Sequence, residues 1–77
     1  MPSVTVYSTP TCPWCHKAKE YFTEKGVAFT DINVASDQAK AEEMFHKSGQ
    51  LGVPVIEING AMVVGFDKEK IDQLLGL

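Results

Sequence analysis

Arginine is absent from this chain of 77 residues, and its seven basic residues are lysines set among ten acidic ones. A net charge of −3 without guanidinium groups argues against nucleic-acid binding, which relies on a basic surface. No apolar run approaches the roughly 20 residues that cross a membrane. No basic segment followed by an apolar run opens the chain, so we see no secretory signal and expect a cytoplasmic location.

Cysteine is scarce as well. Two cysteines are too few for a disulfide scaffold or a four-thiolate zinc site. In a reducing compartment, a close pair of cysteines indicates redox chemistry or metal binding. The chain length fits one domain of about 50 to 250 residues, and a chain this short buries only about 60% of its unfolded surface. We therefore expect residues 1–77 to form a single domain with a small core and no deep enclosed cavity.

The pattern of the chain predicts an α/β fold. Four segments have the β-branched or alternating apolar residues of strands: Val4–Tyr7, Val27–Val34, Val55–Ile58 and Ala61–Val64. Three segments have apolar residues at helical spacing with glycine at their end: Pro13–Lys25, the stretch from Ser36 or Asp37 through Lys47, and the stretch after Asp67. The first strand–helix–strand unit requires a parallel pair, whereas Asn59-Gly60 predicts a tight hairpin and an antiparallel pair. A mixed four-stranded sheet with helices on both faces satisfies both requirements.

The segment Cys12-Pro13-Trp14-Cys15 lies where the first strand gives way to the first helix. Cys12 comes just before the helix, where unpaired amide hydrogens and the helix dipole stabilise a thiolate. Cys15 follows one turn later, about 5 Å away by helix geometry, within the Cα range of about 4.4–6.8 Å found in disulfides. We therefore predict that Cys12 is the nucleophile and Cys15 the resolving thiol.

The same residues fit a second interpretation. Cys12-x-x-Cys15-His16 matches the attachment motif of c-type haem, with His16 as one axial ligand and Met44 or Met62 as the other. The motif follows a predicted strand, and a strand-rich fold of this size leaves little room for a haem. We therefore expect His16 to lie on the surface of the helix.

Four segments together carry a family resemblance: Val4-Thr5-Val6-Tyr7-Ser8, Cys12-Pro13-Trp14-Cys15, Gly52-Val53-Pro54 and Gly65-Phe66-Asp67. Through them the chain resembles the glutaredoxins of the thioredoxin superfamily, from about residue 3 to residue 75. The resemblance implies a thioredoxin-like fold with three helices, strand order 2-1-3-4, and a cis peptide bond between Val53 and Pro54. It also implies a thiol–disulfide oxidoreductase that reduces protein disulfides or glutathione mixed disulfides.

The resemblance further implies a substrate groove beside the thiols. The backbone of Val53 would pair with an extended peptide or with glutathione, and Asp67 would accept a hydrogen bond from an α-amino group. The residues expected to contact substrate are Thr11, Pro13, Trp14, Val53, Pro54, Gly65, Phe66 and Asp67. No metal and no organic cofactor is expected, and glutathione would serve as a co-substrate.

Departures from the family pattern leave the reductant open. Many glutaredoxins have a lysine three residues before the first cysteine, where this chain has Thr9. Glutathione-dependent members usually have two glycines and two acids in the last motif, where this chain has one of each. Gly65-Phe66-Asp67 is similar to the NrdH-redoxins, electron donors to ribonucleotide reductase that are reduced by thioredoxin reductase. We expect weak glutathione binding, and we expect Lys17 and Lys19, the nearest cations, to be solvated.

An alternative of another class is a cluster carrier. Some glutaredoxins bridge a [2Fe–2S] cluster between two chains through the first cysteine, here Cys12, and two glutathiones. Pro13 argues against this arrangement because it stiffens the loop. We therefore expect a monomer that works with disulfide-containing protein substrates.

Overall fold

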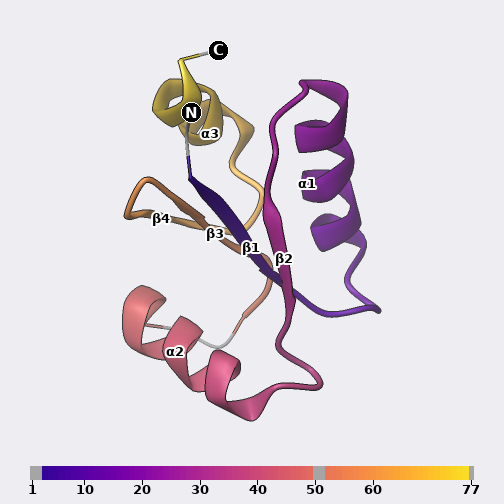
Figure 1. Cartoon of the computed structure of the whole chain (residues 1–77), viewed down its shortest axis with the longest axis vertical. Helices are drawn as coiled ribbons and strands as arrows, with labels where there is room; N and C mark the ends of the chain where they lie inside the picture. The colour runs from indigo at the N-terminus through magenta and orange to yellow at the C-terminus, as the bar shows by residue number, and fades with distance from the viewer. Residues whose placement is uncertain (1–2, 50–51, 77) are drawn as a thin grey trace.

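The computed structural model describes residues 3–49 and 52–76, and it shows a central sheet with helices on both faces (Figure 1). The outermost residues of the expected domain, 1–2 and 77, lie outside the described residues, as do 50–51. The strands are β1 (Val4–Ser8), β2 (Thr30–Asn33), β3 (Val55–Ile58) and β4 (Ala61–Val64). The helices are α1 (Pro13–Glu24), α2 (Gln38–Ser48) and α3 (Lys68–Leu75).

The strand order is β2-β1-β3-β4, which confirms the predicted mixed sheet. β1 runs parallel to β2 and antiparallel to β3, and β3 runs antiparallel to β4. Asn59 and Gly60, which join β3 to β4, have positive φ angles of 52° and 88°, as a tight hairpin of this kind requires.

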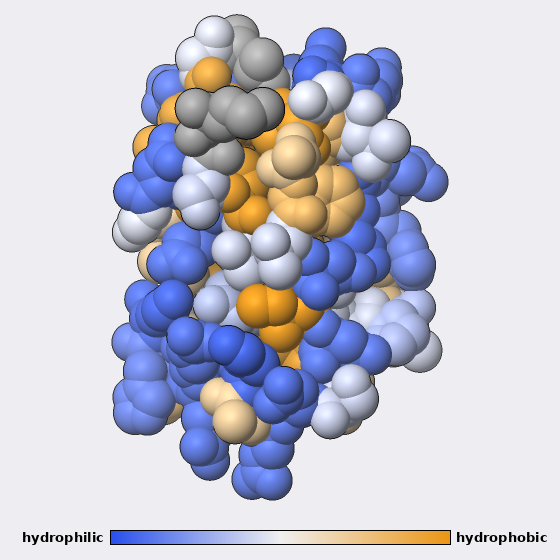
Figure 2. All heavy atoms as spheres, in the orientation of Figure 1, coloured by the Kyte–Doolittle hydropathy of each residue, from blue (hydrophilic) through white to orange (hydrophobic). Residues whose placement is uncertain are grey.

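Alternation along the strands divides the core into two clusters, one on each face of the sheet. Val6 and Ile56 pack with Phe22 of α1 and Ile71 of α3. The residues next to them in the strands point the other way, where Tyr7 and Val55 pack with Met44 of α2. Figure 2 shows the outer surface of the helices covered largely by hydrophilic residues, with apolar atoms visible along the middle.

Side-chain caps set the helix boundaries. Asp37 and not Ser36 caps α2, with its carboxylate accepting a hydrogen bond from the Lys40 amide at 3.1 Å. Asp67 caps α3 in the same way through the Lys70 amide at 3.3 Å. Within the described ranges, none of the helices is long and apolar enough to cross a membrane.

The prediction of a strand over Val27–Val34 was wrong in its extent, since only Thr30–Asn33 pairs with β1. The Val27 amide donates to the Phe22 carbonyl at 2.8 Å, so this residue still belongs to the turn that closes α1. Val27 and Phe29 instead pack against the core cluster on the α1 and α3 side of the sheet. Their alternation with polar residues therefore reflects burial without strand pairing. The other boundaries differ from the prediction by one residue, at the ends of β1, α1 and α2.

Candidate active site

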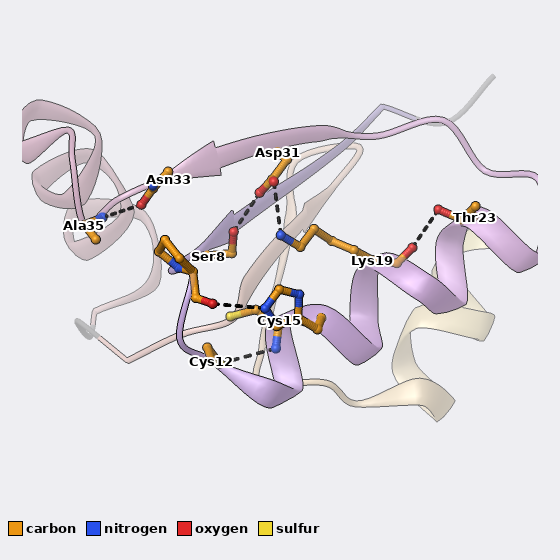
Figure 3. Close-up of polar contacts among 10 residues, drawn as sticks. Ser8, Cys12, Cys15, Lys19, Thr23, Asp31, Asn33 and Ala35 are labelled. Carbon is orange, nitrogen blue, oxygen red and sulfur yellow. Dashed lines mark hydrogen bonds and ion pairs between the residues drawn. The ribbon is translucent and has the colours of Figure 1, made fainter.

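Cys12 is the N-cap of α1, a position where a serine, threonine, aspartate or asparagine oxygen usually accepts a backbone hydrogen bond. Here the sulfur takes that role, and Cys12 Sγ accepts from the Cys15 amide at 3.3 Å (Figure 3). Pro13 occupies the first turn, where its missing N–H leaves no unpaired donor. On its other side, Cys12 Sγ lies 3.8 Å from the carbonyl oxygen of Val53. The half-buried Cys12 sulfur is therefore held between an amide donor and a carbonyl acceptor.

Cys15 differs sharply from Cys12 in its environment. Its side chain is fully buried in the first turn of α1, and both thiols are free in this structure. Burial raises the pKa of the Cys15 thiol to about 11, and its hydrogen bond with Cys12 contributes to the same shift. Cys15 is therefore protonated at neutral pH, as expected for a resolving thiol, which reacts only after a mixed disulfide has formed on Cys12.

The raised pKa of Cys15 predicts how this thiol reacts in a Cys12→Ser variant. Burial, the larger cause of the shift, remains in that variant, so we expect the iodoacetamide alkylation rate to keep rising above pH 9. The thiolate is the reactive form, and a raised pKa moves its formation to higher pH. Mass spectrometry from pH 6 to pH 11 measures this rate. A rate that levels off below pH 9 would contradict the assignment.

A groove of about 290 Å³ adjoins the thiols and is lined by Trp14, Val53, Pro54, Gly65 and Phe66. The Val53–Pro54 peptide bond is cis, as the family resemblance implied. The Gly65 amide donates to the Pro54 carbonyl at 2.8 Å, which joins the two sides of the groove. Trp14, with 56% of its surface exposed, forms one wall, and Val53, whose carbonyl oxygen lies 3.8 Å from Cys12 Sγ, links the groove to the reactive thiol.

Three of the eight expected contact residues do not line this groove. Thr11 and Pro13 are exposed beside Cys12. Asp67 caps α3 and lines a separate hollow together with Glu69, Lys70 and Gln73. Substrate contacts for Thr11, Pro13 and Asp67 stay predictions.

The geometry does not support haem ligation. His16 is exposed on α1, and its Nε2 lies 3.0 Å from the Pro10 carbonyl oxygen. Met44 is buried, and Met62 packs with it, in the core cluster on the α2 side of the sheet. The sheet separates these sulfurs from His16, so they cannot complete an axial pair with it. In residues 3–49 and 52–76, no three His, Cys, Asp or Glu side chains are placed to hold a metal ion.

Lys19 is not the solvated lysine that we expected. Its Nζ lies 3.1 Å from one carboxylate oxygen of Asp31, and Ser8 Oγ donates to the other at 2.6 Å (Figure 3). Partial burial opposes ionisation of Asp31, but the hydrogen bonds from Ser8 and Lys19 outweigh it and lower its pKa. In the sequence, only the four-residue spacing of Cys15 and Lys19 pointed to this network. Ser8 and Asp31 come together through the pairing of β1 with β2, which the local sequence does not reveal. Lys17 is also engaged, with its Nζ 4.7 Å from the centre of the Trp14 ring.

Comparison with known proteins shows the family of this chain. The glutaredoxin family model matches residues 4–63. A glutaredoxin-like 8.6 kDa protein from the rubredoxin operon of Clostridium pasteurianum is 54% identical over 72 residues, covering 94% of this chain and 96% of the relative. Glutaredoxin 3 of Escherichia coli is 40% identical over 67 residues, covering 87% of this chain and 81% of the relative.

Solved structures agree with the fold. The NrdH-redoxin of Escherichia coli, a glutaredoxin-like protein described as having a thioredoxin-like activity profile, superposes with a TM-score of 0.83 at 26% identity. The match covers 94% of this chain and 93% of that one. Solved thioredoxin-like proteins share the arrangement of strands and helices. The chain thus has a thioredoxin-like fold and belongs to the glutaredoxin family of thiol–disulfide oxidoreductases.

Proposed function

We propose that this protein reduces protein disulfides by a dithiol mechanism in which Cys12 attacks and Cys15 resolves. The observation that carries the proposal is the position of Cys12 Sγ at the N-cap of α1, with the Cys15 amide donating to it at 3.3 Å. An amide that already points at the sulfur stabilises negative charge there without rearrangement. The accessible thiol is therefore the one best placed to react as a thiolate.

The reaction proceeds in two exchanges. Cys12 attacks one sulfur of the substrate disulfide, and the other substrate sulfur leaves as a thiolate and takes up a proton. Cys15 then attacks Cys12, releases the second substrate thiol, and leaves a disulfide between the two cysteines. Because the pair spans one helical turn, the bridge closes with little backbone movement. A reductant restores the dithiol.

The groove favours an extended disulfide-containing peptide as substrate. Its lining is largely apolar and includes Trp14, Pro54 and Phe66. The Val53 backbone lines the groove next to Cys12 and offers a main-chain partner to an extended chain, in the manner of an added strand. Main-chain pairing tolerates varied side chains, which suits a reductant of several protein disulfides.

We further propose that a thioredoxin reductase, and not glutathione, is the efficient source of electrons. None of the described residues that line the groove is positively charged. Of the two lysines in α1 that follow the thiols, Lys19 is paired with Asp31, and Lys17 lies against the ring of Trp14 outside the groove lining. A glutathione carboxylate would therefore meet no cation among the described residues that line the groove. The similarity to an NrdH-redoxin at 26% identity favours the same reductant.

A reductant exchange with insulin as the disulfide substrate tests this second proposal. We expect thioredoxin reductase to support at least about tenfold faster turnover than millimolar glutathione with its reductase. Glutathione should bind weakly because the groove lining offers its carboxylates no cation and fits it poorly. Thr9→Lys restores the missing cation and should raise glutathione-dependent turnover about twofold to fivefold, the effect of one exposed ion pair. Efficient turnover of the unmodified protein at low glutathione would contradict the proposal.

A further inference from the structure

The resolving step requires a Cys15 thiolate, which the buried environment of this residue disfavours. Cys15 is fully buried and protonated at neutral pH, yet it must attack as a thiolate. A buried anion is costly unless charges or hydrogen bonds surround it. Groups that stabilise a Cys15 thiolate would therefore speed the second exchange without affecting the first.

Among the described residues, Lys19 is the cation whose charge acts on this thiol. Lys19 follows Cys15 by four residues in α1, so the two side chains lie on the same helix face. Instead of extending into solvent, Lys19 turns toward the sheet, where Asp31 of β2 binds its ammonium at 3.1 Å. Ser8 of β1, which is 2% exposed, fixes the other carboxylate oxygen at 2.6 Å. The Lys19 side chain, 22% exposed, is thereby confined beside the first turn of α1.

The charged and polar groups around Cys15 act in opposite directions. Burial and the neighbouring Cys12 raise its pKa, whereas a hydrogen bond from the Thr9 backbone and the charge of Lys19 lower it. Thr9 and Lys19 line one hollow, together with Ser8, Pro10, His16, Asp31 and Asn33. Asp31 is the anion in this hollow, and His16 is a second titratable group that acts on it. The segment after β1 and the helix α1 thus both lower the pKa of Cys15, through Thr9 and Lys19.

We infer that Lys19, positioned by Asp31 and Ser8, stabilises the Cys15 thiolate and thereby accelerates the resolving step. The inference rests on the proposed dithiol mechanism. In that step Cys15 Sγ forms a bond with Cys12 Sγ, and the bond between Cys12 and the substrate sulfur breaks. The electron pair leaves with the substrate sulfur, which takes up the proton that Cys15 released. Lys19 keeps its proton throughout and acts by charge alone, and Asp31 and Ser8 are positioning residues.

Stopped-flow reaction of the reduced protein with dithiodipyridine separates the two exchanges. This probe is uncharged, so Lys19 exerts no direct attraction on it. Attack by Cys12 releases the first thiopyridone at a rate proportional to probe concentration, and attack by Cys15 releases the second at a concentration-independent rate. Lys19→Met should slow the second phase about threefold at pH 7 and move its pH midpoint upward. The loss of thiolate is partly offset by the higher nucleophilicity of a more basic thiol.

Three variants and one unchanged phase control this experiment. The first phase should be unaffected in Lys19→Met, and Lys19→Arg should restore the second because it keeps the charge. Lys40→Met removes a lysine from the exposed face of α2 and should leave both phases unchanged. A second phase with an unmoved pH midpoint, or equal slowing of both phases, would overturn the inference. Failure of the dithiol mechanism has a different signature, namely a first phase whose rate in Cys12→Ser equals that of the unmodified protein.

Discussion

Cys12→Ser should lower the rate of disulfide reduction at least about a thousandfold, because a serine hydroxyl at this N-cap provides no thiolate to attack sulfur. The fold should be unchanged, since serine is a preferred N-cap residue and can accept the same hydrogen bond from the Cys15 amide. A coupled assay with thioredoxin reductase measures the loss of activity. Thermal unfolding of the same preparation shows whether the variant remains folded.

Cys15→Ser is the matched control for this loss. It removes the buried thiol but leaves Cys12 at the helix terminus beside the Val53 carbonyl. We expect it to keep reducing glutathione mixed disulfides, which needs a single thiol, and to lose the reduction of protein disulfides, which needs two. If Cys15→Ser lost both activities, or if Cys12→Ser kept either of them, the assigned order of attack would be wrong.

Phe22→Ala should lower the free energy of unfolding by about 3–5 kcal/mol, the usual cost of removing a buried aromatic ring. The Phe22 ring is completely buried in the cluster between α1, α3 and the sheet. It contacts Tyr21 edge-on at 6.1 Å between ring centres and lies 5.8 Å from Phe29. A domain of this size has a total stability of only about 4–12 kcal/mol at the usual value per residue, so much of it would be lost. Urea unfolding followed by circular dichroism measures the change.

Phe45→Ala makes the same chemical change at an exposed site. Phe45 lies on α2 with 45% of its surface exposed, and among the described aromatic rings it contacts only its neighbour His46, edge-on. We expect its replacement to cost less than about 1 kcal/mol, because little apolar surface returns to water. If the two variants lost comparable free energy of unfolding, the cluster on the α1 side would not be the main core.

Local pattern determined the elements and the chemistry of this protein. Asn59-Gly60 specified a hairpin because both residues must take positive φ, and the structure has that hairpin. The order of strands and helices, together with the family resemblance, predicted the mixed sheet and the cis bond before Pro54. The position of Cys12 at a helix start followed from Pro13 and the strand before it. The hairpin and the helix start depend on residues close together in the chain, whereas the cis bond came from the family resemblance alone.

Tertiary structure decided which side chains meet across the chain. The alternation of Val27 and Phe29 looked like strand pairing, but these side chains pack beneath α1 and only Thr30–Asn33 joins β1. The parallel register of β1 and β2 pairs Ser8 with Asn33, places Ser8 against Asp31, and leaves Asp31 to bind Lys19. Register arises from contacts between segments more than twenty residues apart. Helix periodicity and caps carry no information about such contacts, so the surroundings of Cys15 became visible only in the folded chain.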